Sequence, residues 1–102
     1  MNSAMLVDLV TSQAVRIHKP LFRIGRCADA DLPLDDGTVS RVHCCITVKN
    51  GSYYLTDLGS ANGTSAGNTV LRPRVPVQIS DGTVIRIAGR FYQFVLVKPE
   101  GL

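Results

Sequence analysis

Short runs of strand-forming residues, separated by turn residues, recur along this chain of 102 residues from end to end. Apolar residues alternate with polar ones or come in short β-branched runs, and no window of about eleven residues carries a helical apolar period. About ten short strands with turn signals between them are typical of a β-sandwich. The pattern therefore predicts an all-β fold.

Local signals place the individual strands. The expected strands are residues 4–10, 14–17, 21–25, 32–34, 43–49, 53–57, 69–71, 77–79, 83–87 and 90–97. Pro33 puts its strand at a sheet edge, because proline cannot donate to a central ladder. Asn50-Gly51 predicts a two-residue hairpin turn. The last strand is the longest and is apolar on both faces, which predicts a central position, whereas residues 59–68 are expected to form a loop.

Length and composition predict one globular domain. Hydrophobic residues make up 45% of the chain, which is enough for a core that needs neither metal nor disulfide. We expect residues 1–102 to be a single domain excised from a larger protein, with the charged tail 98–102 as a boundary. No apolar run approaches the roughly 20 residues of a membrane span, so no membrane segment is expected within this chain.

Charge and cysteine content indicate which kind of partner and which cellular compartment to expect. The net charge is +3, but the 11 lysines and arginines are scattered, unlike the clustered basic stripe of a nucleic-acid reader. An odd number of cysteines and no signal peptide indicate a reducing, cytoplasmic location. Cys44 and Cys45 are adjacent in an expected strand and so face opposite ways. They and Cys27 are expected to be small buried or half-buried thiols.

Three short motifs fall where the strand pattern breaks into loops. They are Gly25-Arg26, Ser40-Arg41-Val42-His43 and the eight residues 57–64, DLGSANGT.

The side chains in these motifs suit a phosphorylated peptide. The planar fork of Arg26 can bind two phosphate oxygens, and Arg41 adds a second positive charge beside the hydroxyl donor of Ser40. The Asn62 amide carries a donor and an acceptor together and can pair with both backbone groups of a peptide. The motifs therefore predict recognition of a phosphate on a polypeptide.

Enzymatic alternatives find little support in the sequence. Ser40 and His43 are not set in a nucleophile elbow, and no acid has a clear place to orient the histidine. Four aspartates, at positions 29, 31, 35 and 36, lack the spacing of a calcium loop and are expected to be solvated loop charges. We therefore expect no enzyme, no cofactor and no metal site.

The order and spacing of the motifs resemble the forkhead-associated (FHA) family, whose pattern covers residues 21–97 of this chain. The resemblance implies a β-sandwich of about eleven strands, related to the SMAD/FHA fold, with its binding site in loops at one end. It assigns the phosphothreonine site to Arg26, Ser40 and Asn62, and a further phosphate contact to Arg41. It makes His43 a structural histidine that braces the binding loop.

Further residues take supporting or bordering roles by the same resemblance. Asp57 matches the acidic residue that closes the strand before the Asn-Gly loop. Gly25, Gly63 and Thr64 complete the structural support of the site. The family often has a threonine or serine where this chain has Ala61, which removes one phosphate contact. Thr38, Ala61, Ala66 and Asn68 are expected to form the rim of a pocket that reads the peptide beyond its phosphothreonine.

The function that follows is a phosphothreonine-dependent binding module, monomeric, which recruits the substrate of a Ser/Thr kinase. Its partner is a phosphothreonine-containing protein or peptide, in trans or within its own parent protein. The alternative is a structural interaction domain that binds without phosphate in a larger assembly such as a secretion apparatus. Ala61 favours the alternative, whereas the joint presence of Arg26, Ser40 and Asn62 favours the phosphopeptide.

Overall fold

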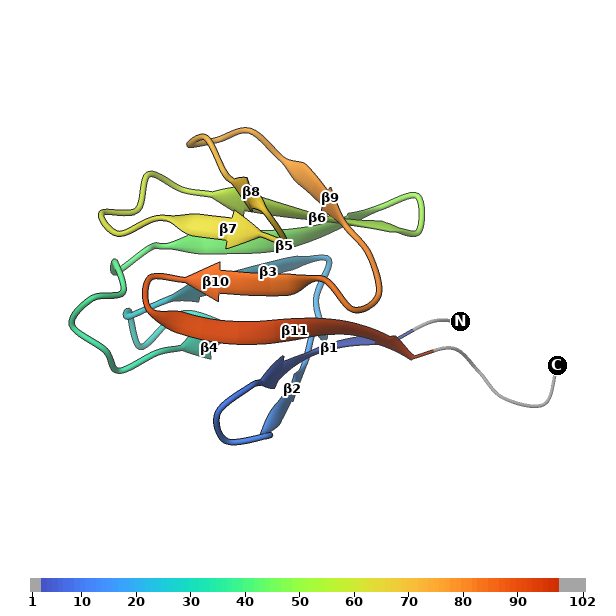
Figure 1. Ribbon diagram of the computed structural model, residues 1–102, viewed down its shortest axis with the longest axis horizontal. Helices are drawn as coiled ribbons and strands as arrows, with labels where there is room; N and C mark the ends of the chain where they lie inside the picture. Colours follow the sequence, from blue (N-terminus) through green and yellow to red (C-terminus); the bar gives the residue numbers. More distant parts are fainter. Residues whose placement is uncertain (1–2, 98–102) are drawn as a thin grey trace, which may run out of the picture.

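The computed structural model describes residues 3–97, which form eleven strands and no helix (Figure 1). The strands are β1 (Ser3–Asp8), β2 (Ala14–Arg16), β3 (Leu21–Gly25), β4 (Leu32–Pro33), β5 (Cys44–Lys49), β6 (Ser52–Asp57), β7 (Thr64–Ala66), β8 (Thr69–Val70), β9 (Val77–Ile79), β10 (Val84–Ile87) and β11 (Arg90–Val97). Within the described residues no helix is long and apolar enough to span a membrane. The all-β prediction is confirmed, and the charged tail 98–102 lies outside the described residues.

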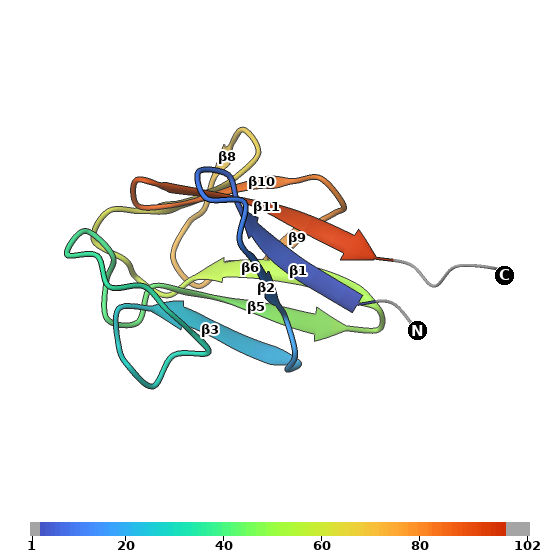
Figure 2. The ribbon, with the colours of Figure 1, turned by 90° about the horizontal axis from the view of Figure 1, so that it is seen from below.

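The strands form two stacked sheets, as Figure 2 shows from the side. One sheet has six strands in the order β2-β1-β11-β10-β7-β8, and the other has five in the order β4-β3-β5-β6-β9. The strand β1 begins and β11 ends at one end of the sandwich, beside the β5–β6 turn. The β4–β5, β6–β7 and β10–β11 connections lie at the other end (Figure 1).

The core lies between the sheets and forms one cluster of buried side chains. Phe22 and Ile24 of β3 contribute from the five-stranded sheet, and Leu6 of β1 and Phe94 of β11 from the six-stranded sheet. The ring of Phe94 packs against that of Tyr53 in the opposite layer, with 5.1 Å between centroids. Burial of these alternating apolar side chains supplies the main driving force of the fold.

The strand β11 is central in its sheet, as predicted, but the reason differs from the expected one. Tyr92 and Phe94 face the core, whereas Phe91 is 45% exposed and Val97 41% exposed on the outer face. Both faces of the strand are apolar in sequence, yet only one is buried. Its central position comes from pairing with β1 and β10.

Two predictions made from local sequence signals are confirmed. The strand β4 is an edge strand that pairs in parallel with β3, so the missing N–H of Pro33 faces no partner strand. Asn50 and Gly51 both have positive φ, 52° and 79°, and connect β5 to β6 in a hairpin. Two positive φ angles are what a primed hairpin turn requires.

The observed strands depart most from the expected ones at two places. The strand β1 ends at Asp8 rather than residue 10, because the Asp8 carboxylate accepts the N–H groups of Val10 and Thr11 and turns the chain. The expected loop 59–68 contains the strand β7, which pairs with β10. A strand of three residues with so distant a partner leaves no local pattern.

Candidate ligand-binding site

The first two motifs meet where β3 ends and β5 begins. The Arg26 N–H donates to the Ser40 carbonyl at 2.9 Å, and the Cys27 N–H donates to the Arg41 carbonyl at 3.1 Å. This ladder continues beyond the strands themselves. It sets the Gly-Arg motif directly beside the Ser-Arg motif.

Gly25 is required by this close approach. A Cβ built at its position would lie 2.2 Å from the Arg41 carbonyl oxygen, far inside van der Waals contact. The φ of Gly25 is not positive, so its support of the site does not come from the left-handed conformation that glycine favours. Gly25 lets two backbones pass close together at the edge of the site.

Two hydrogen bonds that involve side chains join the third motif to Ser40 and Thr38 in the β4–β5 loop. The Ala61 N–H donates to the Ser40 Oγ at 3.0 Å, and the Asn62 Nδ2 donates to the Thr38 carbonyl at 2.7 Å. The Ser40 hydroxyl accepts from Ala61 and keeps its own proton free to donate. Thr38, Ser40, Ala61 and Asn62 thus lie together at one end of the sandwich.

His43 connects the β4–β5 loop to the β6–β7 loop from a buried position beneath them. Its side chain is completely buried, its Nδ1 accepts the Ser40 N–H at 3.0 Å, and its Nε2 lies 3.0 Å from the Gly63 carbonyl. Both bonds form only when the ring is neutral with its proton on Nε2. Neither ring nitrogen faces the Ser40 hydroxyl, so this pair is a brace rather than a nucleophile with its base.

Asp57 organises the β6–β7 loop from a buried position. Its carboxylate accepts the Gly59 and Ser60 N–H groups and the hydroxyls of Ser60 and Thr64. Burial acts to raise the pKa of Asp57, but these hydrogen bonds outweigh it and hold the pKa below its usual value. A charged carboxylate therefore fixes the loop that carries Asn62.

Ser60 is a contributor that the sequence analysis missed. Its Oγ donates to Asp57 and accepts the Gly63 N–H at 3.0 Å, which closes the loop around Asn62. Gly63 has a φ of 84°, a conformation that favours glycine. The spacing of Asp57 and Ser60, three residues apart, is a local side-chain-to-backbone signal that could have identified this turn.

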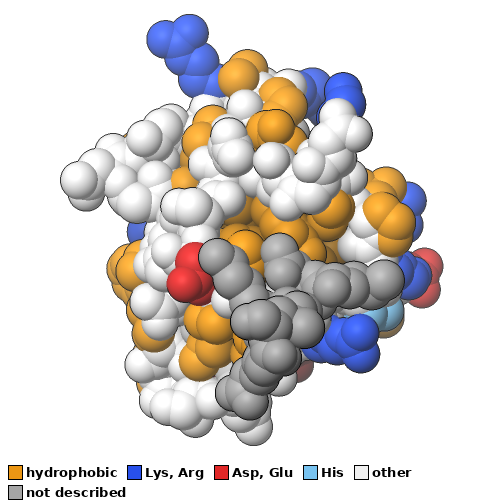
Figure 3. Space-filling model, turned by 90° about the vertical axis from the view of Figure 1, so that its right-hand side faces the viewer, with side chains coloured by type: hydrophobic (Ala, Val, Ile, Leu, Met, Phe, Trp, Pro, Cys, Tyr) orange, Lys and Arg blue, Asp and Glu red, His pale blue; other side chains and the backbone are white. Residues whose placement is uncertain are grey.

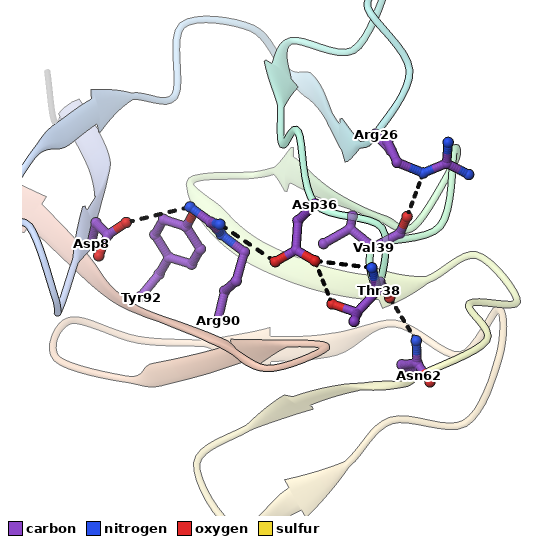
Figure 4. Close-up of polar contacts among 8 residues, drawn as sticks. All are labelled: Asp8, Arg26, Asp36, Thr38, Val39, Asn62, Arg90 and Tyr92. Carbon is purple, nitrogen blue, oxygen red and sulfur yellow. Dashed lines mark hydrogen bonds and ion pairs between the residues drawn. The ribbon is translucent and has the colours of Figure 1, made fainter.

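The cationic side chains remain at the surface. Arg26 is exposed, and its Nε donates to the Val39 carbonyl at 3.0 Å. Its two terminal nitrogens point away from that carbonyl (Figure 4). Arg41 is exposed beside Ser40.

Figure 3 views the opposite end of the sandwich, where hydrophobic side chains are visible across the middle of the face.

Two of the expected rim residues do not reach this site. Ala66 is only 8% exposed and belongs to the core cluster, because its side of β7 faces inward. Asn68 lies in the turn between β7 and β8, at the far end of β7 from Thr64. Thr38 and Ala61 are exposed and adjoin Asn62 and Ser40.

Two of the expected solvated loop charges are in fact engaged. Asp31 pairs with Lys19 at 2.8 Å and accepts the Arg23 N–H at 2.8 Å. Asp36 lies near Arg90 and accepts from Thr38. These aspartates are expected to be solvated because they lack the spacing of a calcium loop, and that argument does not reveal partners such as Lys19 and Arg90.

The cysteines behave as buried thiols. All three are free, with Cys44 and Cys45 buried and Cys27 half-buried. Burial raises the pKa of both Cys44 and Cys45, which leaves them as unreactive thiols. Among residues 3–97 no group of three His, Cys, Asp or Glu side chains is placed to hold a metal ion.

Fold and candidate site together describe a β-sandwich domain whose exposed arginines, serine hydroxyl and asparagine amide lie on loops at one end. The family model of the FHA domain matches residues 22–88. The chain therefore belongs to the FHA domain family.

Curated relatives support this placement. The chain is 34% identical over 91 residues to the transcriptional regulatory protein EmbR of Mycobacterium tuberculosis. This match covers 89% of this chain and 23% of EmbR. The chain is 36% identical over 85 residues to the oxoglutarate dehydrogenase inhibitor of Corynebacterium diphtheriae, covering 83% of this chain and 54% of that protein. The chain thus spans about a quarter to a half of the length of these relatives.

Solved structures agree with the fold. A structure of M. tuberculosis EmbR in complex with a low-affinity phosphopeptide superposes with a TM-score of 0.88 at 30% identity, over 98% of this chain and 26% of that one. An FHA domain from an analysis of phosphothreonine-dependent FHA interactions gives a TM-score of 0.81 at 32% identity, over 95% and 98% of the two chains.

Proposed function

We propose that this domain binds phosphothreonine peptides, in trans or from its own parent protein, and recruits the substrate of a Ser/Thr kinase. The observation that carries the proposal is the convergence of Arg26, Ser40, Arg41 and Asn62 on loops that are already cross-linked. Arginine clusters and hydroxyl donors of this kind are a recurring means of phosphopeptide recognition. The free thiols fit a reducing, cytoplasmic compartment where such kinases act.

Each group has a distinct task in the proposed complex. Arg26 and Arg41 supply charge-assisted hydrogen bonds to the phosphate, each worth about 1.5–3 kcal/mol when well aligned. Ser40 donates its free hydroxyl proton. Asn62 uses one amide proton on Thr38, which leaves its carbonyl oxygen and second proton for the peptide backbone.

Ala61 reduces the number of side chains that can donate to a phosphate. It offers only a backbone N–H, and that group already donates to Ser40. Phosphate binding therefore depends on Arg26, Ser40 and Arg41 alone. A phosphate-independent interaction domain remains the second candidate, and Ala61 is the observation that favours it.

Calorimetric titration distinguishes the two candidates. Degenerate phosphothreonine, phosphoserine and unphosphorylated peptide pools are titrated into the domain. We expect binding to the phosphothreonine pool alone, abolished in Arg26→Ala, because the exposed arginine supplies ligand contacts but little core stability.

Arg16→Ala is the matched control, since Arg16 is an exposed arginine on β2, in the other sheet. It should bind like the parent. Equal binding to the phosphorylated and unphosphorylated pools would instead support the phosphate-independent alternative.

A further inference from the structure

The segment 36–39 of the β4–β5 loop is held by three side chains from three different elements (Figure 4). Arg26, after β3, donates to the Val39 carbonyl, and Asn62, in the β6–β7 loop, donates to the Thr38 carbonyl. Arg90, at the start of β11, faces Asp36. Two of these side chains belong to the proposed site, and the third belongs to the other sheet.

Arg90 reaches the segment from the six-stranded sheet. Its Nη1 lies 3.5 Å from the Asp36 Oδ2, its Nη2 lies 3.7 Å from the Asp8 Oδ2, and its Nε donates to the Tyr92 hydroxyl at 3.2 Å. The guanidinium is therefore set between two carboxylates by a hydrogen bond within its own strand. Its side chain is 36% exposed, and those of Asp8 and Asp36 are 15% and 27% exposed.

Asp36 links Arg90 to Asn62 through Thr38. Its Oδ1 accepts both the Thr38 N–H at 2.9 Å and the Thr38 hydroxyl at 2.7 Å, and the Thr38 carbonyl then accepts from Asn62. Hydrogen bonds from the Thr38 side chain and backbone, with a smaller contribution from Arg90, hold the pKa of Asp36 below its usual value. The orientation of the Thr38 carbonyl is thus tied to Asp36 and, through it, to Arg90.

We infer that Arg90 and Asp36 are positioning residues for peptide binding: together they hold Thr38 so that its carbonyl orients the Asn62 amide toward the ligand. The inference rests on the proposed function, since it concerns the same site. Neither residue touches the peptide. Their effect is to fix one amide orientation in advance, which reduces the entropy lost on binding.

Asp8 provides an unusually close control. In Asp36→Asn, the Oδ1 that accepts from Thr38 is kept, and the charged oxygen that faces Arg90 becomes a neutral amide. In Asp8→Asn, the Oδ1 that accepts from Val10 and Thr11 is kept, and again only the oxygen facing Arg90 changes. Each variant weakens one ion pair of Arg90, but only the pair with Asp36 is connected through Thr38 to Asn62.

The first measurement uses the free protein and follows the Asn62 side-chain amide signals by nitrogen-15 NMR. We expect these signals to shift in Asp36→Asn and in Arg90→Gln, and to stay in place in Asp8→Asn. A purely structural role for the ion pairs would not move them selectively. Unchanged Asn62 signals in Asp36→Asn would overturn the inference, whether or not the domain binds phosphopeptide.

The second measurement titrates a single phosphothreonine peptide, selected from the degenerate pool, into each variant. We expect Asp36→Asn to weaken binding about two- to fivefold, the range of a partly exposed ion pair, and Asp8→Asn to leave it unchanged. Arg90→Lys, which keeps the charge, should retain more affinity than Arg90→Gln. Equal weakening in Asp36→Asn and Asp8→Asn would mean a general loss of stability and would contradict the inference. No binding by the parent would instead count against the proposed function.

Discussion

In the proposed site, buried polar side chains hold the loops in place and exposed cationic side chains are available to a ligand. His43, Asp57 and Thr64, the buried polar residues of the described chain, all lie beneath the binding loops. They are there because loop backbone groups that leave the strand ladders still need hydrogen-bond partners. Arg26 and Arg41 stay at the surface, where a ligand can reach them.

His43→Ala tests the brace. The substitution leaves the Ser40 N–H without its partner, takes one of two donors from the Gly63 carbonyl, which keeps the Ala88 N–H, and leaves a cavity where the buried ring was. Together these losses cost about 2–5 kcal/mol in the free energy of unfolding. We expect the melting temperature to fall by roughly 10 °C or more, measured by calorimetry or circular dichroism.

The other histidine of the chain is the control for this change. His18 is exposed, so His18→Ala should shift the melting temperature far less. A His43→Ala protein as stable as the parent, with weakened peptide binding, would show that His43 acts on the ligand rather than on the loops.

At the scale of the elements, the strands themselves were largely predictable. The ranges 21–25, 77–79 and 90–97 agree with β3, β9 and β11, because alternation and turn residues mark them locally. The strand β7 was not predictable, since it is defined by pairing with β10 and not by its own composition. Ala66 was misplaced for the same reason: its inward direction is set by that pairing.

The end of β3 offers a test at this scale. Gly25→Ala places a methyl group against the Arg41 backbone, which cannot move without displacing the site, and overpacking of this kind costs about 1–3 kcal/mol. We expect a lower melting temperature and weaker phosphopeptide binding together.

Gly37→Ala is the corresponding control. A Cβ at Gly37 meets no atom within 4 Å, and its φ is not positive. Both properties of the protein should therefore stay near those of the parent. Normal peptide affinity in Gly25→Ala would show that the close approach at Gly25 does not hold the site in shape.

At the scale of the whole molecule, carboxylates connect distant parts of the fold and make its stability sensitive to acid. The pKa values of Asp8, Asp31, Asp36 and Asp57 are all lowered from an ordinary value of 3.8. A folded-state pKa below the unfolded one stabilises the fold above the unfolded value. That contribution is lost as the pH falls through the folded-state pKa.

We therefore expect the contribution of these carboxylates to be complete at neutral pH and to decline below about pH 4. Thermal melting measured from pH 7 down to pH 3 checks this expectation. Asp57→Asn should be less stable at neutral pH but should lose less stability on acidification. A melting temperature in the parent that does not change down to pH 3 would contradict the assignment.

Local features of the chain are enough to predict the all-β class, most strands, the β5–β6 hairpin and the residue types that suit a phosphopeptide. These follow from local pattern, turn chemistry and side-chain character, which need no partner to be recognised. The tertiary structure alone decided which of these groups meet. His43 reaches Gly63, Asn62 reaches Thr38 and Arg90 reaches Asp36 only because two sheets bring sequence-distant loops together, and no local pattern records such a contact.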